Sequence, residues 1–172
     1  MKILKVYTDG RYIPRLKSGA TSFIVLEVLP DENKLLTESA KFYQMKEAEK
    51  LTFYNTNHKM EIQAVINSLN WLRSKGLSKS HRIYVYTDSQ NIQLAVDDWM
   101  EKWKARDWKT SAGNLVKNKK MWEKLDVLSE EFTSLFINWV QGHNGDEWNE
   151  RADELCRVVM EKQLAHETNV KI

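Results

Sequence analysis

The order of strand-like and helix-like segments limits the folds open to this 172-residue chain more than any other feature. Three segments rich in β-branched and aromatic residues come first, at residues 3–9, 21–29 and 34–44, and turn residues between them predict antiparallel hairpins. Helical and strand-like patterns then alternate, which predicts an α/β domain with a mixed sheet. The later elements expected are a helix at 58–73, a strand at 82–87, a helix from Ser89 or Gln90, a helix at 118–131, a strand at 135–140 and a helix at about 146–166.

Composition favours a single globular domain. With 6 Gly and 2 Pro, the chain cannot be collagen-like, low-complexity or linker-rich. Its longest apolar run, residues 23–26, is too short to span a membrane, and its polar start does not resemble a signal peptide. The single cysteine, Cys156, cannot form an internal disulfide. We therefore expect one domain over residues 1–172, monomeric and in the cytoplasm.

Positive charge is concentrated in one region, although the net charge is only +2. Residues 99–124 hold eight Lys and Arg against three Asp and Glu, and four of the 7 Trp. Interleaved cations and aromatic rings suit contact with a nucleic-acid backbone and its sugars or bases. A solvated amphipathic helix with its indoles in the core is the alternative, and the pattern by itself favours neither.

Two carboxylates follow identical short sequences. Val-Tyr-Thr-Asp occurs at residues 6–9 and again at 85–88, each time at the end of a predicted strand. Ligands in open α/β sheets gather at the carboxyl ends of strands, so Asp9 and Asp88 are candidates for a site there. The alternative for Asp88 is to cap the helix that follows.

Two further carboxylates lie on predicted helices in phase with apolar residues. Glu61 shares a face with Val65 and Leu72, and a buried, unpaired carboxylate would cost several kcal/mol, so a cation or metal is expected beside it. Asp153 is in phase with the apolar residues of the last helix. Its alternative is an ion pair with Arg157, four residues on.

A cluster of Asp9, Glu61, Asp88 and Asp153 would need divalent cations to neutralise it. Oxygen ligands favour Mg²⁺ or Mn²⁺, and two such ions about 4 Å apart are a known device for in-line phosphoryl displacement. Zinc is not expected, because the chain has no Cys pair and its four histidines lack the spacing of a tetrahedral site.

The four carboxylates stand in motifs with a definite order. These are Thr8-Asp9-Gly10, Met60-Glu61, Thr87-Asp88-Ser89-Gln90 and Gly142-His143-x-Gly145-x3-Asn149-Glu150-x-Ala152-Asp153. In order and spacing they resemble the type I ribonuclease H family, and the similarity runs from about Leu4 to about Arg157. The resemblance implies a ribonuclease H-like fold, a five-stranded mixed sheet flanked by helices. Its first three strands would be antiparallel, and the fourth and fifth parallel to the first.

The resemblance also implies an activity. Family members are endonucleases that hydrolyse the RNA strand of an RNA/DNA hybrid and leave 3′-hydroxyl and 5′-phosphate ends. Asp9, Glu61, Asp88 and Asp153 match the metal-binding carboxylates, which would hold two Mg²⁺, with Mn²⁺ as a substitute. His143 matches a histidine beside the site and is expected to handle a proton or assist product release.

Substrate-binding residues are carried over in the same way. Asn57 and Gln90 match positions that read the minor groove, where 2′-hydroxyls distinguish RNA from DNA; their alternative role is helix capping. A basic protrusion at about residues 97–117 matches the segment that cradles the DNA strand, although Trp99 and Trp103 could instead pack on each other. The matching residues are Trp99, Lys102, Trp103, Lys104, Arg106, Trp108, Lys109 and Lys117, whereas Trp122 and Trp139 are assigned to the core.

Two departures from the family pattern concern the substrate side. Family members commonly have Ser and a Gly- and Pro-rich loop after Asp-Gly, whereas this chain has RYIPRLKSG at residues 11–19. His58 stands where Asn is usual. Arg11 and Arg15 could replace backbone contacts to phosphate by side-chain charge, which would alter grip or cleavage specificity.

Other functions stay open at this point. A binding module could hold hybrid or double-stranded RNA without cutting it, and a resolvase- or transposase-like nuclease could use the same carboxylates on another substrate. The intact carboxylates argue against the first, and Asn57 and Gln90 against the second. A purely structural protein would leave the order of the motifs unexplained.

Overall fold

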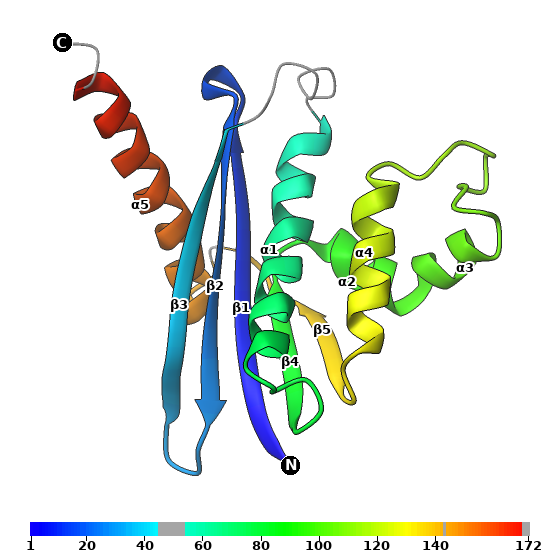
Figure 1. Cartoon of the computed structure of the whole chain (residues 1–172), viewed down its shortest axis with the longest axis horizontal. Helices are drawn as coiled ribbons and strands as arrows, with labels where there is room; N and C mark the ends of the chain where they lie inside the picture. Colours follow the sequence, from blue (N-terminus) through cyan, green and yellow to red (C-terminus); the bar gives the residue numbers. More distant parts are fainter. Residues whose placement is uncertain (45–53, 143, 170–172) are drawn as a thin grey trace.

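The computed structural model describes residues 1–44, 54–142 and 144–169, and in it five strands form one mixed sheet (Figure 1). The strands are β1 (Lys2–Ile13), β2 (Ser18–Val28), β3 (Asn33–Gln44), β4 (His81–Thr87) and β5 (Leu135–Trp139). The helices are α1 (Tyr54–Ser74), α2 (Gln90–Leu94), α3 (Met100–Lys104), α4 (Lys119–Glu130) and α5 (Glu147–Asn169), with a short 3-10 helix η1 (Pro14–Leu16) and a π-helical stretch η3 (Ala95–Trp99) between α2 and α3.

The sheet has the order β3-β2-β1-β4-β5. The pairs β1–β2 and β2–β3 are antiparallel, whereas β1–β4 and β4–β5 are parallel. The predicted fold class is therefore confirmed, including the direction of every strand.

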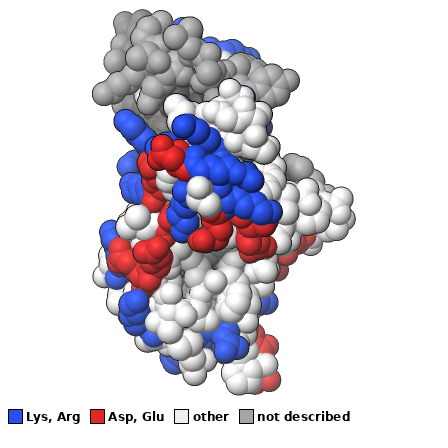
Figure 2. All heavy atoms as spheres, turned by 90° about the vertical axis from the view of Figure 1, so that its right-hand side faces the viewer, with Lys and Arg blue, Asp and Glu red and all other residues white. Residues whose placement is uncertain are grey.

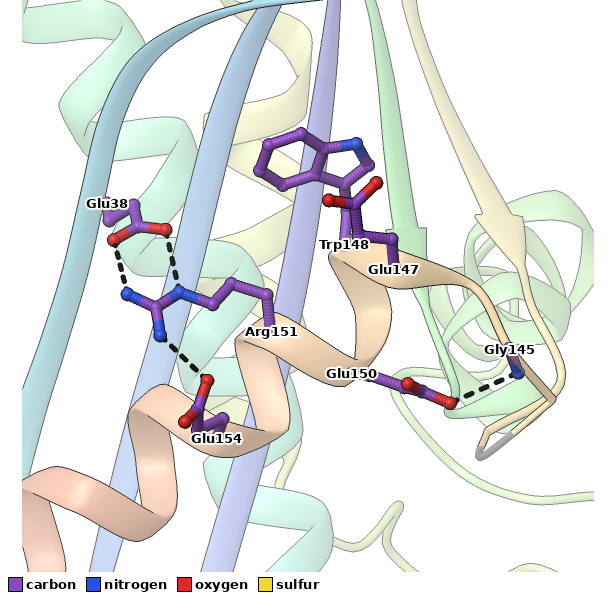
Figure 3. Close-up of a pocket in the computed structure, with 7 residues that line it drawn as sticks. All are labelled: Glu38, Gly145, Glu147, Trp148, Glu150, Arg151 and Glu154. Carbon is purple, nitrogen blue, oxygen red and sulfur yellow. Dashed lines mark hydrogen bonds and ion pairs between the residues drawn. The ribbon is translucent and has the colours of Figure 1, made fainter.

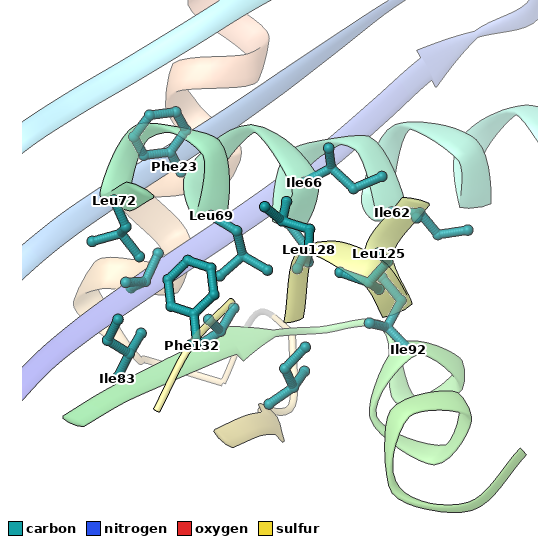
Figure 4. Packing of buried hydrophobic residues seen from close by; sticks show 14 of the residues in the cluster. Phe23, Ile62, Ile66, Leu69, Leu72, Ile83, Ile92, Leu125, Leu128 and Phe132 are labelled. Atoms are coloured by element: carbon teal, nitrogen blue, oxygen red, sulfur yellow. The ribbon is translucent and has the colours of Figure 1, made fainter. Parts of the chain in front are cut away.

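The main core lies between the sheet and the helices α1 and α4. Successive side chains of a strand point to opposite faces, so Leu4 and Val6 of β1 lie on the same face and pack in this core. Figure 4 shows the row of α1 side chains in this core, with Leu125 and Leu128 of α4 beside them. Labelled members of this cluster are Phe23, Ile62, Ile66, Leu69, Leu72, Ile83, Ile92, Leu125, Leu128 and Phe132.

Helix α5 packs against the opposite face of β1, β2 and β3. There Tyr7, Ile24 and Leu26 contact Ala152, and a further cluster joins Cys156 and Met160 of α5 to the sheet. With α1 on one face and α5 on the other, both helices that carry candidate carboxylates lie against β1. Among the described helices, none has the length and apolar character needed to cross a bilayer.

Two predictions about local structure are wrong. The first strand, predicted over residues 3–9, instead runs to Ile13, because the residues after Gly10 pair with β2 in a hairpin that is closed by η1 and by Lys17 at φ 49°. Trp139, assigned to the core, is 43% exposed, since it is the last residue of the edge strand β5. The core assignment of Trp122 is confirmed.

Candidate active site

Asp9 and Asp88 lie together at the edge of the sheet where β4 ends. Strands β1 and β4 are parallel neighbours with Thr8 opposite Thr87. Asp9 and Asp88, the next residue of each chain segment, therefore lie side by side. One oxygen of Asp9, Oδ2, is buried and has no hydrogen-bond partner among the described residues. Asp88 does not cap α2, because Ser89 occupies the N-cap position.

Glu61 reaches this edge because α1 crosses β1 at very short range. A Cβ atom on Gly10 would lie 2.2 Å from the backbone nitrogen of Glu61 and 2.4 Å from the carbonyl oxygen of Met60. No side chain fits there, so glycine at this position is what allows the helix to bring Glu61 beside Asp9. The sequence pattern predicted only that a strand ends just before this glycine.

The Glu61 carboxylate is held by two neighbours on its own helix. Asn57 donates from Nδ2 to Oε1 at 2.9 Å, and Nδ1 of His58 lies 3.1 Å from Oε2. Asn57 also accepts a hydrogen bond of 3.1 Å from the backbone N–H of Tyr12. It therefore connects the extended end of β1 to Glu61, and it is not a helix cap.

Asp153 projects from α5 and contacts β1. Nη1 of Arg11 lies 3.4 Å from its Oδ1, and both side chains are partly exposed. Arg157 does not pair with Asp153; it pairs with Glu161 at 2.9 Å and more loosely with Glu154 at 3.9 Å. Asp153 thus contacts Arg11 of β1, whereas Arg157, which is exposed, pairs only with acids of its own helix among the described residues.

The four carboxylates act on one another electrostatically. The pKa of Asp9 is raised to about 7, mainly by burial and next by the negative charge of Asp88, with smaller increases from Asp153 and Glu61 and an opposing decrease from Cys156. A carboxylate with such a pKa is costly to keep ionised near neutral pH without a compensating cation.

The donor set fits a hard divalent cation by its chemistry. All four side chains offer oxygen, and the buried Oδ2 of Asp9 lacks a partner among the described residues. As the described side chains stand, no three His, Cys, Asp or Glu are arranged around one point. Oxygens of Glu61 and Asp153 are instead engaged by Asn57, His58 and Arg11.

A cluster of indoles lies next to this edge. Trp103 is at its centre, with ring centroids 5.8 Å from Trp99, 6.4 Å from Trp108 and 5.7 Å from Trp122. The His58 ring lies 5.5 Å from Trp122, which joins the cluster to the start of α1. The indoles therefore pack on each other, and Trp99, Trp103 and Trp122 also line a surface pocket of about 430 Å³. Their contact with nucleic acid stays a prediction.

The cations of residues 97–117 differ in their surroundings. Nζ of Lys104 lies 2.8 Å from Glu101 and 3.0 Å from Asp126 of α4, so its charge is already paired. Figure 2 shows Lys and Arg side chains gathered on this side of the molecule, with Asp and Glu beside them. Arg106, Lys109 and Lys117 are exposed, as are Asn57 and Gln90 near the carboxylates.

The RNase H family model matches residues 1–161 of the chain. The chain belongs to the ribonuclease H family. A ribonuclease H from Neorickettsia sennetsu is 33% identical over 164 residues, which cover 95% of this chain and 94% of that protein. A ribonuclease H from Chromobacterium violaceum is 42% identical over 106 residues, 62% of this chain and 69% of that protein.

Solved ribonuclease H structures share the fold. LC9-RNase H1, a type 1 RNase H with the type 2 active-site motif, superimposes with a TM-score of 0.73 at 22% identity, covering 92% of this chain and 72% of that one. LC11-RNase H1, solved in complex with RNA/DNA hybrid, gives a TM-score of 0.66 at 20% identity over 94% and 99% of the two chains.

The family's Gly-His block lies beside Asp88, but His143 itself is outside the described residues. A Cβ atom on Gly142 would lie 3.1 Å from Oδ2 of Asp88, so the chain entering the block runs directly along that carboxylate. The exposed Trp139 donates its indole N–H to the carbonyl oxygen of Asp88 at 3.1 Å. No local sequence pattern predicts this contact, because a tryptophan at the end of a strand is usually assigned to the core.

One surface pocket of this ribonuclease H family member contains none of the four carboxylates. It has a volume of about 640 Å³ and lies between β3 and the start of α5. Figure 3 shows Arg151 between two acids in its wall: it donates to both oxygens of Glu38 at 3.0 Å and to Glu154 at 2.7 Å. Trp148 supplies an aromatic surface. The ion pairs neutralise Arg151, which suits a structural role in holding α5 to β3.

Proposed function

We propose that this chain is a metal-dependent endoribonuclease that hydrolyses the RNA strand of RNA/DNA hybrids. Family membership supports the ribonuclease class, and LC11-RNase H1, which has the same fold, was solved with a hybrid. The observation that carries the proposal is the buried Asp9 carboxylate, whose charge is opposed by Asp88, Asp153 and Glu61. Like charges held close together repel one another, and divalent cations bound between them would neutralise that repulsion.

Asp9, Glu61, Asp88 and Asp153 are the proposed ligands of two Mg²⁺, or Mn²⁺ in their place. Such a pair of ions would supply activation of the attacking water and stabilisation of the leaving oxygen, giving 3′-hydroxyl and 5′-phosphate ends. The chain positions these oxygens through the close crossing at Gly10 and through the hydrogen bonds of Asn57 to Tyr12 and Glu61.

His143 is proposed to move a proton during or after cleavage. The approach of its neighbour Gly142 to Asp88 supports this role. Imidazole is suited to this task because it gains and loses a proton near neutral pH.

The substrate would lie across the exposed residues next to the carboxylates. Asn57 and Gln90 are proposed to contact the minor groove, where the 2′-hydroxyls of the RNA strand are exposed. The DNA strand would contact the indole cluster and the basic residues, where phosphate charge is met by Lys and Arg. These residues are Trp99, Trp103, Trp108, Lys104, Arg106, Lys109 and Lys117, among which Lys104 should contribute least because it is already paired.

A cleavage assay with four labelled substrates tests the proposal. With Mg²⁺ the protein should shorten the RNA strand of an RNA/DNA hybrid and leave duplex RNA and duplex DNA intact, and a DNA duplex with one ribonucleotide measures its specificity. Asp9→Asn and Asp88→Asn should abolish cutting, whereas Asp31→Asn, in the exposed turn between β2 and β3, should not.

Other outcomes identify the alternatives. A hybrid that shifts in mobility but is never shortened would indicate a binding module, and cutting of duplex DNA would indicate a nuclease of another substrate class. Cutting by Asp9→Asn or Asp88→Asn would contradict the assignment of the carboxylates. A single domain, a monomeric state and a cytoplasmic location stay predictions from the sequence.

A further inference from the structure

Arg11 departs from the family pattern and lies beside Asp153, one of the four carboxylates. It stands two residues after Asp9 on β1, so both side chains project from the same face of the strand. The strand continues through this position because Arg11 pairs with Ala20 of β2. The extended backbone therefore presents the guanidinium to the cluster, where a turn after Gly10 would not.

The guanidinium contacts one of the proposed metal ligands. Nη1 of Arg11 lies 3.4 Å from Oδ1 of Asp153, and the side chains are 42% and 36% exposed. A long, partly exposed pair of this kind is weak, because water screens the charges and two flexible side chains must be ordered. It can form and break without rearrangement of the fold.

We propose that Arg11 is an internal counter-cation that holds Asp153 until a divalent cation displaces it, and that it thereby lowers the affinity of the site for that cation. This inference rests on the proposed metal-dependent function. Arg11 and the incoming ion compete for the same oxygen and also repel each other. From the strength of exposed ion pairs, the competition should weaken ion binding by up to about fivefold.

The competition predicts opposite effects of Arg11 in the two states of the site. Without a divalent cation, Arg11 offsets part of the repulsion between Asp153 and Asp9. With the cation bound, that compensation is no longer needed, and the arginine only adds repulsion. A residue with a merely structural role would stabilise the protein equally in both states.

The first test measures Mn²⁺ binding in the absence of nucleic acid, from the EPR signal of the free ion. Arg11→Ser introduces the residue usual in the family and should bind Mn²⁺ up to about fivefold more tightly than wild type. Arg11→Lys keeps the cation and should remain close to wild type. Arg15→Ser removes an exposed arginine from the same hairpin and should change the affinity little. Arg11→Gln replaces Arg11→Ser if the latter does not fold.

The second test measures thermal unfolding with EDTA and with saturating Mg²⁺. Arg11→Ser should lower Tm in EDTA and lose that deficit in Mg²⁺. Equal, measurable Mn²⁺ affinities of wild type and Arg11→Ser would overturn the role of Arg11 alone. If neither protein binds Mn²⁺, the proposed metal dependence fails as well.

Discussion

Replacing Asp9 by Asn should stabilise the metal-free protein even as it abolishes cutting. The pKa of Asp9 is raised from 3.8 to about 7, first by burial and then by the charge of Asp88. About three pKa units correspond to about 4 kcal/mol, which the ionised native state carries as a cost. Asn has nearly the same shape without the charge, so the variant should gain up to about 4 kcal/mol at pH 8.

The pH dependence of this gain has a definite sign. Below about pH 4 the Asp9 carboxyl is protonated in both the unfolded and the folded chain, so it costs nothing. Between about pH 4 and pH 7 the unfolded chain ionises while the folded chain keeps the proton, so wild-type stability falls relative to Asp9→Asn. Above pH 7 the difference should stay constant.

Urea unfolding in EDTA at several pH values measures the difference directly. The free energy of unfolding of Asp9→Asn minus that of wild type should grow between pH 4 and pH 7, whereas Asp31→Asn should show no comparable trend. Mg²⁺ should then stabilise wild type far more than Asp9→Asn. Equal stability of the two proteins at pH 8 in EDTA, or a difference that does not vary with pH, would refute the reasoning.

Three further predictions follow from the contacts around the site. Gly10→Ala should destabilise the protein by about 3 kcal/mol or more in urea unfolding, because the new Cβ would overlap the backbone at Glu61. Lys104→Ala should weaken hybrid affinity less than Lys109→Ala, since Lys104 is already paired, and only Lys109→Ala should reduce the salt slope of binding by about one. Trp139→Phe removes the indole hydrogen bond to the β4–α2 turn and should lower kcat up to about fivefold with little change in KM for hybrid cleavage.

The spacing of apolar residues along the chain predicted most of the helices and strands. The alternation of β-rich and helical segments depends on which side chains must be buried, and the burial of Ile62, Val65 and Leu69 on one face of α1 follows the predicted helical spacing. The end of the first strand was less accurate, because the strand predicted over residues 3–9 runs through Gly10 to Ile13. At Gly10 the residue serves a close helix crossing, which no local pattern encodes.

Contacts between segments far apart in the sequence could not be predicted from the spacing of residues within one segment. The helical i,i+4 rule paired Asp153 with Arg157, but the orientation of α5 on the sheet turns Asp153 toward Arg11 instead. Trp139 looked like core because tryptophan is usually buried, yet its place at the end of the edge strand leaves it exposed. Both outcomes depend on how elements pack, and packing is decided by the whole chain.

The repeated Val-Tyr-Thr-Asp sequence acquires its meaning from strand register. In the parallel pair β1–β4 the identical residues stand opposite each other, and the rings of Tyr7 and Tyr86 stack with centroids 4.9 Å apart. The repeat alone predicts two strand ends, but only this register makes the two aspartates that follow immediate neighbours. Their proximity is then why Asp88 raises the pKa of Asp9. The sequence feature that first marked the site therefore also contributes, after burial, to the electrostatic cost that Asp9→Asn should remove.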